Sequence, residues 1–174
     1  MITQEIATEP LLKEWKQTED HLLKAISRYS DENFHTIPFE GSWTAAQVCD
    51  HVAKSLARVV ISLSQQNEAT ERMPGQHTEM LKSVFLNFDQ KFQSPVAILP
   101  DDKPANKNDM YKKLKNIGDQ LSNAIEKEDL SQLCTFYPFP TIGNLTRLEW
   151  LSFSCFHTQR HVFQLEKIYK HLNQ

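Results

Sequence analysis

Four long segments of this chain repeat their apolar residues at the spacing of an amphipathic helix. They run over about residues 9–29, 45–66, 110–128 and 147–172. Residues three, four or seven positions apart lie on one face of a helix, so each segment predicts a helix with one buried side. Strand-like alternation is weak, and only 4 of 174 residues are Gly, which disfavours a turn-dense β-sandwich. We therefore predict an all-α four-helix bundle that forms one domain over residues 1–174.

Local capping signals mark the starts of the last three of these helices. Thr44 with Gln47, and Thr146 with Glu149, have the spacing of a capping box, in which side chains and backbone amides of the first turn bond reciprocally. Either Asn108 or Asp109 is the expected cap of the third helix. Apolar residues surround much of the fourth helix, which predicts neighbours on more than one side.

The second and third helices are joined by a long connection, from about Glu68 to Lys107. Such a length permits the two helices to run parallel, as in bundles with a crossover. Apolar residues around 81–88 are spaced for one short amphipathic helix inside it. Four prolines exclude a continuous helix: Pro74, Pro95, Pro100 and Pro104.

Charge and cysteine content limit the partners and the compartment. Lys and Arg number 19 against 22 Asp and Glu, so no basic surplus supports nucleic-acid binding, and we expect none. The three cysteines are odd in number and form no C-x-x-C pair, which suits a reducing compartment. Residues 1–5 lack the start of a secretory signal, and no apolar run is long enough to span a membrane. We therefore expect a cytoplasmic protein.

Two of the seven histidines, His157 and His161, are placed at i and i+4 on the fourth predicted helix. Side chains at that spacing share a face, so two imidazoles can turn toward one divalent ion. Such a pair also arises by chance in many helices. The residue after His157 is Thr158, so the pair is not the H-E-x-x-H motif and carries no metalloprotease-type glutamate.

A third histidine, His51, lies on the edge of the apolar stripe of the second helix. A histidine that points toward a bundle core needs a polar partner or a ligand role. Together with His157 and His161 it would give three nitrogen ligands from two facing helices, and at least one coordination position would stay open for water or substrate. The alternative is that His51 is a satisfied core histidine unrelated to the pair.

Two motifs around these histidines resemble those of the DinB/YfiT-like family. Residues 42–51 are similar to the family pattern S-W-[ST]-x-x-Q-x-x-x-H, which ends at His51. Residues 143–165 are similar to G-x-L-T-x-x-E-W-L-x-F-x-x-x-H-x-x-R-H-x-x-Q-[LI], which contains His157 and His161. A K-F-x-x-P element at 91–95 also resembles that of a subgroup, and the helix order agrees across nearly the whole chain.

The resemblance implies a divalent metal, nickel or zinc, held by the histidines that match the motifs: His51, His157 and His161. Relatives include thiol-dependent S-transferases and a thiol-dependent isomerase. We therefore predict a metal-dependent enzyme, a transferase of the thiol S-transferase type or a hydrolase-like enzyme, with a small-molecule thiol as cosubstrate. The alternative is a non-catalytic helical module that binds a metal or another ligand. Analogy with the family leaves a homodimer open.

Residues beside the proposed ligands carry further expectations, and no catalytic residue is assigned. Arg160 is expected to form an outer-face salt bridge, with an anionic substrate as the alternative, and Asp50 is expected to face solvent. Gln164, one turn from His161, is a candidate hydrogen-bond partner for it. Gln47 and Glu149 are expected to cap their helices, and Cys49 and Cys155 are expected to be buried as small apolar residues. The other four histidines are expected at surface or loop positions: His21, His35, His77 and His171.

Overall fold

The computed structural model describes residues 8–174. Residues 1–5, on which the expectation of a cytoplasmic protein partly depends, lie outside the described residues. The elements in chain order are α1 (Thr8–Ser27), α2 (Asp31–Phe34), α3 (Ala45–Ser64), β1 (Asn67–Glu68), α4 (Thr78–Phe85), the 3-10 helix η1 (Val96–Ile98), α5 (Lys107–Lys127), β2 (Leu133–Cys134) and α6 (Arg147–Leu172).

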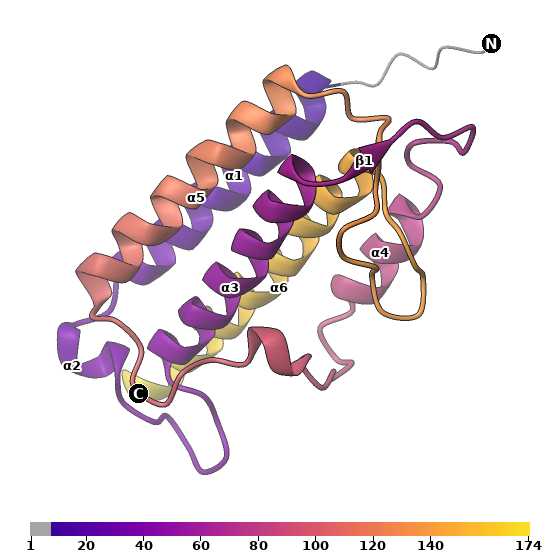
Figure 1. Cartoon of the computed structure of the whole chain (residues 1–174). Coiled ribbons are helices and arrows are strands. Elements are labelled where there is room, and N and C mark those ends of the chain that lie inside the picture. The colour runs from indigo at the N-terminus through magenta and orange to yellow at the C-terminus, as the bar shows by residue number, and fades with distance from the viewer. Residues whose placement is uncertain (1–7) are drawn as a thin grey trace.

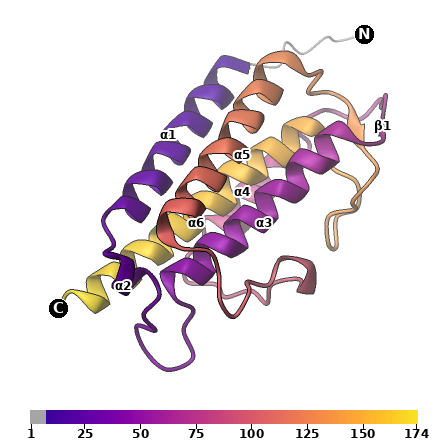
Figure 2. The same cartoon turned by 60° about the vertical axis from the view of Figure 1, so that its left-hand side comes forward.

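Helices α1, α3, α5 and α6 form a four-helix bundle, so the predicted all-α architecture is confirmed. Helix α1 packs on α5 and α6, and α3 packs on the same two helices from the other side. Figures 1 and 2 show that α3 and α5 run in the same direction, while α1 and α6 run in the opposite one. The long connection between α3 and α5 makes this arrangement possible, because it returns the chain along the length of the bundle.

The first turns of the helices follow the local signals in most cases. Both predicted capping boxes are present, at the starts of α3 and α6. The expected cap of α5 at 108–109 was wrong: Asn106 is the cap, and its side chain accepts a hydrogen bond from the amide of Asp109. The helix therefore begins before its first apolar residue, because Asn106 supplies the acceptor one turn earlier.

One close approach in the core depends on a glycine. The indole of Trp15 donates a hydrogen bond of 3.1 Å to the carbonyl of Gly118, which ties α1 to α5. A Cβ atom at Gly118 would lie 2.0 Å from a carboxylate oxygen of Glu19. Gly118 thus costs some helix propensity but leaves room for the Glu19 side chain between the two helices.

The connection between α3 and α5 covers one side of the bundle. Its short helix α4 packs on α6, which therefore has neighbours in α1, α3 and α4, as its broad apolar surface predicted. After α4 the chain crosses α3 through η1 (Figure 1). Strand β1 pairs with β2 in a short antiparallel ladder, where the connection meets the loop that leads to α6. Within residues 8–174, none of the helices is long and apolar enough to cross a membrane.

Candidate metal centre

Three histidines from two helices of the bundle meet with their ring nitrogens. Nε2 of His157 lies 3.1 Å from Nε2 of His51 on α3 and 3.2 Å from Nε2 of His161 on its own helix α6. The candidate ligand atoms of all three lie within 4.8 Å of one another. The structure therefore brings together all three residues that the sequence singles out as metal ligands.

The outer nitrogens of two of these rings define which nitrogen carries the proton. Nδ1 of His51 lies 2.8 Å from the backbone carbonyl of Ile98, and a carbonyl oxygen can only accept, so Nδ1 is protonated. Nδ1 of His161 lies 2.8 Å from the side-chain oxygen of Gln164, which fixes the same tautomer. Both rings consequently present the bare lone pair of Nε2 to the centre, and the expected Gln164–His161 contact is confirmed.

All three imidazoles are held in the neutral form that a metal ligand needs. Their side chains are buried, with 2% of His51, 4% of His157 and 7% of His161 exposed. Burial lowers the pKa of each, that of His157 well below its ordinary value and that of His161 to about 3. For His157 and His161 the neighbouring histidines lower the pKa further, because a second positive charge beside the first is unfavourable.

A divalent cation fits this donor set better than a proton does. A proton on Nε2 of His157 can satisfy only one of the two lone pairs that face it, whereas one ion accepts all three nitrogens. Two nitrogens that each lie ~2.1 Å from an ion are ~3.0 Å apart at a right angle and ~3.4 Å apart at the tetrahedral angle. The separations from His157 to His51 and to His161, 3.1 and 3.2 Å, fall between these values. All three nitrogens lie within 4.8 Å of one another, so a small turn of the His51 or His161 ring would bring them onto one ion.

A short segment of the connection is clamped over His51 by side chains of α3. Asp50 accepts a hydrogen bond of 2.9 Å from the amide of Asp101, and Lys54 donates to the carbonyl of Leu99 and to the Asp101 carboxylate. The same clamp holds the Ile98 carbonyl against His51. The expectation that Asp50 faces solvent was wrong, because the connection folds back over it and leaves 4% of it exposed.

Arg160 holds a second part of the connection against α6. Its guanidinium donates to the backbone carbonyls of Asn87, at 2.8 Å, and of Gln90, and it lies over the ring of Phe92 at 4.9 Å. The expected outer-face salt bridge was wrong: within the described chain no carboxylate pairs with this arginine. Backbone carbonyls occupy its donors instead, so it anchors the cover of the histidine cluster.

The wall beside His157 is aromatic. The His157 ring packs against Phe153 with a centroid separation of 5.1 Å and against Phe85 at 6.0 Å. Phe139, from the loop before α6, extends this wall by packing on both phenylalanines. Among the described residues, Nδ1 of His157 has no hydrogen-bond partner. The cluster is therefore polar at its centre and apolar on this side.

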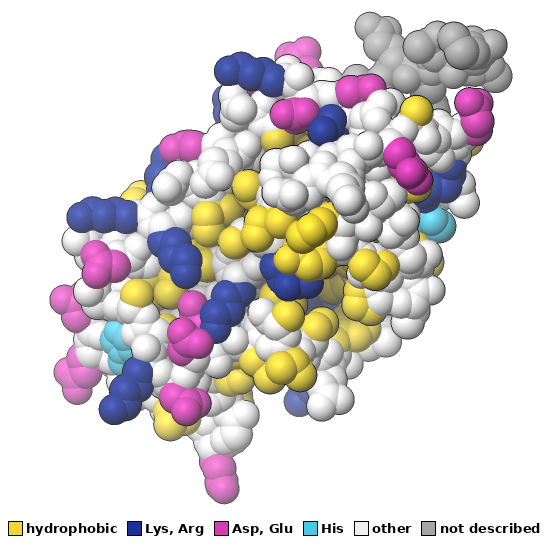
Figure 3. Space-filling model, viewed as in Figure 1, with side chains coloured by type: hydrophobic (Ala, Val, Ile, Leu, Met, Phe, Trp, Pro, Cys, Tyr) yellow, Lys and Arg dark blue, Asp and Glu magenta, His cyan; other side chains and the backbone are white. Residues whose placement is uncertain are grey.

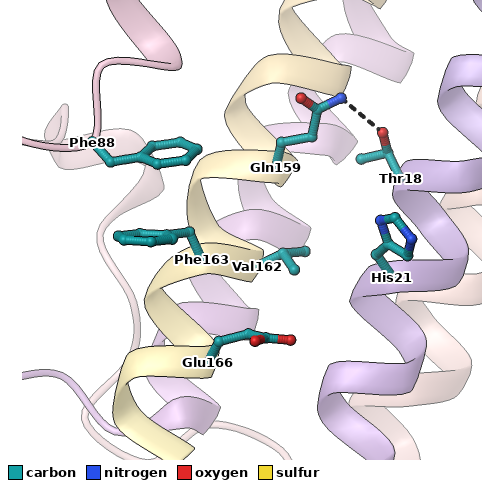
Figure 4. A pocket seen from close by; sticks show the side chains of 7 residues that line it. All are labelled: Thr18, His21, Phe88, Gln159, Val162, Phe163 and Glu166. Atoms are coloured by element: carbon teal, nitrogen blue, oxygen red, sulfur yellow. Dashed lines mark hydrogen bonds between the residues drawn. The ribbon is translucent and has the colours of Figure 1, made fainter.

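The other residues considered from the sequence lie away from the cluster or have structural roles. Cys49 and Cys155 are fully buried, as expected. His21 lines a separate concavity of about 250 Å³ between α1 and α6, which Figure 4 shows with Phe88 against Phe163 and a hydrogen bond from Gln159 to Thr18. None of the three clustered histidines lines that concavity.

Comparison with known proteins agrees with the architecture and with the position of the motifs. The profile of the DinB superfamily matches residues 14–165, a span that includes all three clustered histidines. The chain belongs to the DinB superfamily. It is similar to the uncharacterized protein YuaE of Bacillus subtilis, with 25% identity over 170 residues that cover 94% of each chain. Among solved structures, the four-helix bundle protein TT2238 matches at a TM-score of 0.58 and 18% identity, over 92% of this chain and 99% of that one.

Membership of the superfamily and the three-histidine cluster together make the place where α3 and α6 bring these histidines together the candidate functional site. The superfamily is commonly associated with metals, and the cluster has the donor set for one. The relative YuaE adds no activity, and TT2238 supports the fold alone.

Proposed function

We propose that this DinB-superfamily protein is a metal-dependent enzyme of the thiol S-transferase type. The observation that carries the proposal is the convergence of three buried Nε2 atoms, two of which have their protons directed outward to Ile98 and Gln164. We propose nickel or zinc as the ion, held by His51, His157 and His161. When bound, such an ion would lower the pKa of a thiol and hold it as the thiolate.

The residues of the chain bury the histidines and hold them in position. Three protein ligands leave a position for an exchangeable group, whereas structural zinc sites are closed by four protein ligands. The clamp of Asp50 and Lys54 on residues 98–101 supports the ring of His51, and Arg160 keeps residues 85–90 over α6. The site is thereby rigid on both helices, as orientation of a reacting group requires.

The thiol must come from a small-molecule cosubstrate. Cys49 and Cys155 are buried, and burial raises the pKa of both thiols. Burial also raises the pKa of Cys134 to about 11. None of these cysteines joins the histidines in the metal-ligand cluster of the described chain. In the proposed reaction the thiol of the cosubstrate loses its proton to solvent, its sulfur forms a bond to an electrophilic carbon, and the leaving group departs from that carbon with its bonding electron pair.

The test combines metal content with turnover. Protein purified without an affinity tag should carry close to one equivalent of nickel or zinc by elemental analysis, and His51→Ala should lose it. His171→Ala, at an exposed histidine of the same helix as His157, should keep the metal and serves as the matched control. Turnover of a low-molecular-weight thiol with monochlorobimane should depend on metal and disappear in His157→Ala.

A non-catalytic role is the second candidate. Among the described residues, no carboxylate joins the histidine cluster as a ready acid or base, because Asp50 is engaged by Lys54 and by the amide of Asp101. Full metal occupancy without turnover across a panel of thiols would favour such a metal-binding module. The expectations of a cytoplasmic location, of a homodimer, and of no nucleic-acid partner stay predictions.

A further inference from the structure

Arg58 on α3 differs from the other arginines of the described chain in having no anionic or carbonyl partner. Arg28, Arg72 and Arg147 each pair with a carboxylate, and Arg160 donates to backbone carbonyls. The guanidinium of Arg58 instead lies 3.9 Å above the ring of Tyr137, and within residues 8–174 it makes neither a hydrogen bond nor an ion pair. Stacking of this kind leaves the planar edge of the guanidinium, with its N–H groups, free for a ligand.

The position of Arg58 relates it directly to the proposed metal ligands. It lies seven residues after His51, which is two turns of the same helix and the same helical face. The separation of the two Cα atoms along the axis is therefore ~10.5 Å. Side chains on a helix lean toward its N-terminus, so the Arg58 side chain is inclined toward the turn that carries His51.

The loop between β2 and α6 joins the surroundings of Arg58 to the wall of the histidine cluster. Tyr137 of this loop stacks with Arg58, and Phe139, two residues later, packs on Phe153 at 5.1 Å. Phe153 in turn packs on the ring of His157 at the same separation of 5.1 Å. The same short loop thus carries both the ring that stacks on the guanidinium and a ring in the aromatic wall of the proposed ligands.

The outer surface at this place is apolar and hollowed. Figure 3 shows hydrophobic side chains gathered around a hollow on the face where α3, η1 and the loop before α6 meet, with basic side chains at its border. The segments around it carry exposed hydrophobic residues, among them Phe92, Val96 and Phe136. The guanidinium of Arg58 is half-buried, has no counterion among residues 8–174, and stacks on Tyr137 of the loop that borders this hollow. It is therefore a site for an anionic group on a small molecule.

We infer that Arg58 binds the carboxylate of the small thiol cosubstrate and so directs its sulfur toward the three histidines. This inference rests on the proposed function, and it narrows the cosubstrate to thiols that carry a carboxylate. A planar guanidinium accommodates a carboxylate through two parallel hydrogen bonds, which fixes the orientation of the molecule as well as its position. Arg58 would be a binding and positioning residue, because it acts on a part of the cosubstrate that does not react.

The test compares two thiols that differ in one carboxylate. N-acetylcysteine and N-acetylcysteamine are titrated into nickel-loaded protein, and the dissociation constant is read from the thiolate-to-nickel charge-transfer absorbance. Glutathione and its diethyl ester form a second, longer pair that covers a greater distance from the sulfur to the carboxylate. The wild-type protein should bind the carboxylate-bearing member of at least one pair ~10- to 100-fold more tightly, the range of a charge-assisted hydrogen bond.

Substitution of Arg58 should remove this preference without removing the site. In Arg58→Gln the two thiols of a pair should bind with nearly equal affinity. In Arg58→Lys the preference for the carboxylate-bearing thiol should be intermediate, because an ammonium keeps the positive charge but cannot form the two parallel hydrogen bonds of a guanidinium. In turnover, Arg58→Gln should raise KM for the carboxylate thiol with little change in kcat. Arg28→Gln is the matched control, because Arg28 stacks on Tyr169 at 4.1 Å outside the hollow, and it should keep the wild-type preference.

The outcomes separate this inference from the proposed function. Equal affinity of the wild-type protein for both members of both pairs would overturn the role of Arg58 while leaving the thiol chemistry intact. A preference for the carboxylate-bearing thiol that survives in Arg58→Gln would overturn the role of Arg58 in the same way. Absence of a nickel–thiolate band with every thiol, together with no thiol turnover by the zinc-loaded protein, would refute the proposed function, and the assignment of Arg58 with it.

Discussion

The three buried histidines should make the metal-free protein sensitive to mild acid. His157 and His161 are neutral in the folded state. Burial is the main cause, and the charge of His51, with that of His161 in the case of His157, adds to it; the pKa of His157 is held well below its ordinary value and that of His161 at about 3. In the unfolded chain a histidine takes up its proton near pH 6.5. Between pH 7 and pH 5 the unfolded state therefore binds two protons that the folded state does not, and the free energy of unfolding falls as pH falls.

The size of the effect follows from the number of these histidines. Each contributes a slope of about 1.4 kcal/mol per pH unit well below pH 6.5, which amounts to about 2 kcal/mol between pH 7 and pH 5. His157 and His161 together should thus lower the free energy of unfolding by about 4 kcal/mol, against a total of about 5–15 kcal/mol for an ordinary domain. His51, whose pKa is also lowered by burial, adds to the loss in the same direction.

Urea unfolding of EDTA-treated protein at pH 7, 6 and 5, followed by circular dichroism, measures this slope. His161→Leu should reduce the loss by about 2 kcal/mol, because one proton-binding group is removed from the unfolded chain. His171→Gln is the matched control and should retain the wild-type slope, since its imidazole is exposed in the folded protein as well. A free energy of unfolding that stays level from pH 7 to pH 5, or a His161→Leu slope equal to wild type, would refute the buried neutral cluster.

Two further substitutions test the close contacts around α5 and α6. Gly118→Ala should gain less than the ~1 kcal/mol that Ala contributes over Gly inside a helix, because the new Cβ would displace the flexible end of the Glu19 side chain. In a Glu19→Ala background the same substitution should give the full gain in thermal or urea unfolding, and an equal gain in both backgrounds would contradict the contact. Gln164→Leu should weaken metal binding ~10- to 100-fold in a competition titration, because it removes the acceptor of the His161 Nδ1 proton. Gln159→Leu is the control: Gln159 lies on the side of α6 that faces α1, so the metal affinity should stay near that of the wild-type protein.

Features that depend on one or two helical turns could be predicted from the sequence. The capping boxes at Thr44 and Thr146 form because their partners are three residues away, so the starts of α3 and α6 need no tertiary information. The i, i+4 spacing of His157 and His161 likewise determines that both rings share a face of α6. The motif that ends at His51 added the third ligand by resemblance, and the fold then brought it within reach of the pair.

Contacts between distant parts of the chain were decided by the tertiary structure. Asp50 has the local surroundings of a solvent-exposed residue, yet the connection returns 51 residues later and places the amide of Asp101 on its carboxylate. Arg160 similarly finds its acceptors 70 to 75 residues away, in backbone carbonyls that no sequence pattern marks. Glu149 is predicted as a cap. Its carboxylate also accepts hydrogen bonds from both terminal nitrogens of Arg72 and from the backbone amide of His77.

The difference between the features that the sequence predicts and those that it does not has a physical reason. Helix periodicity, caps and the shared face of a histidine pair are set by backbone geometry within a few residues, and the side chains that produce them are neighbours in the sequence. The tautomer of His51, the cover over the histidine cluster and the unpaired state of Arg58 are set by where the chain lies after the helices have packed. Local patterns in the sequence therefore predict a helical bundle with three candidate ligands, whereas the packing of α3, α6 and their connection brings these ligands together as neutral imidazoles.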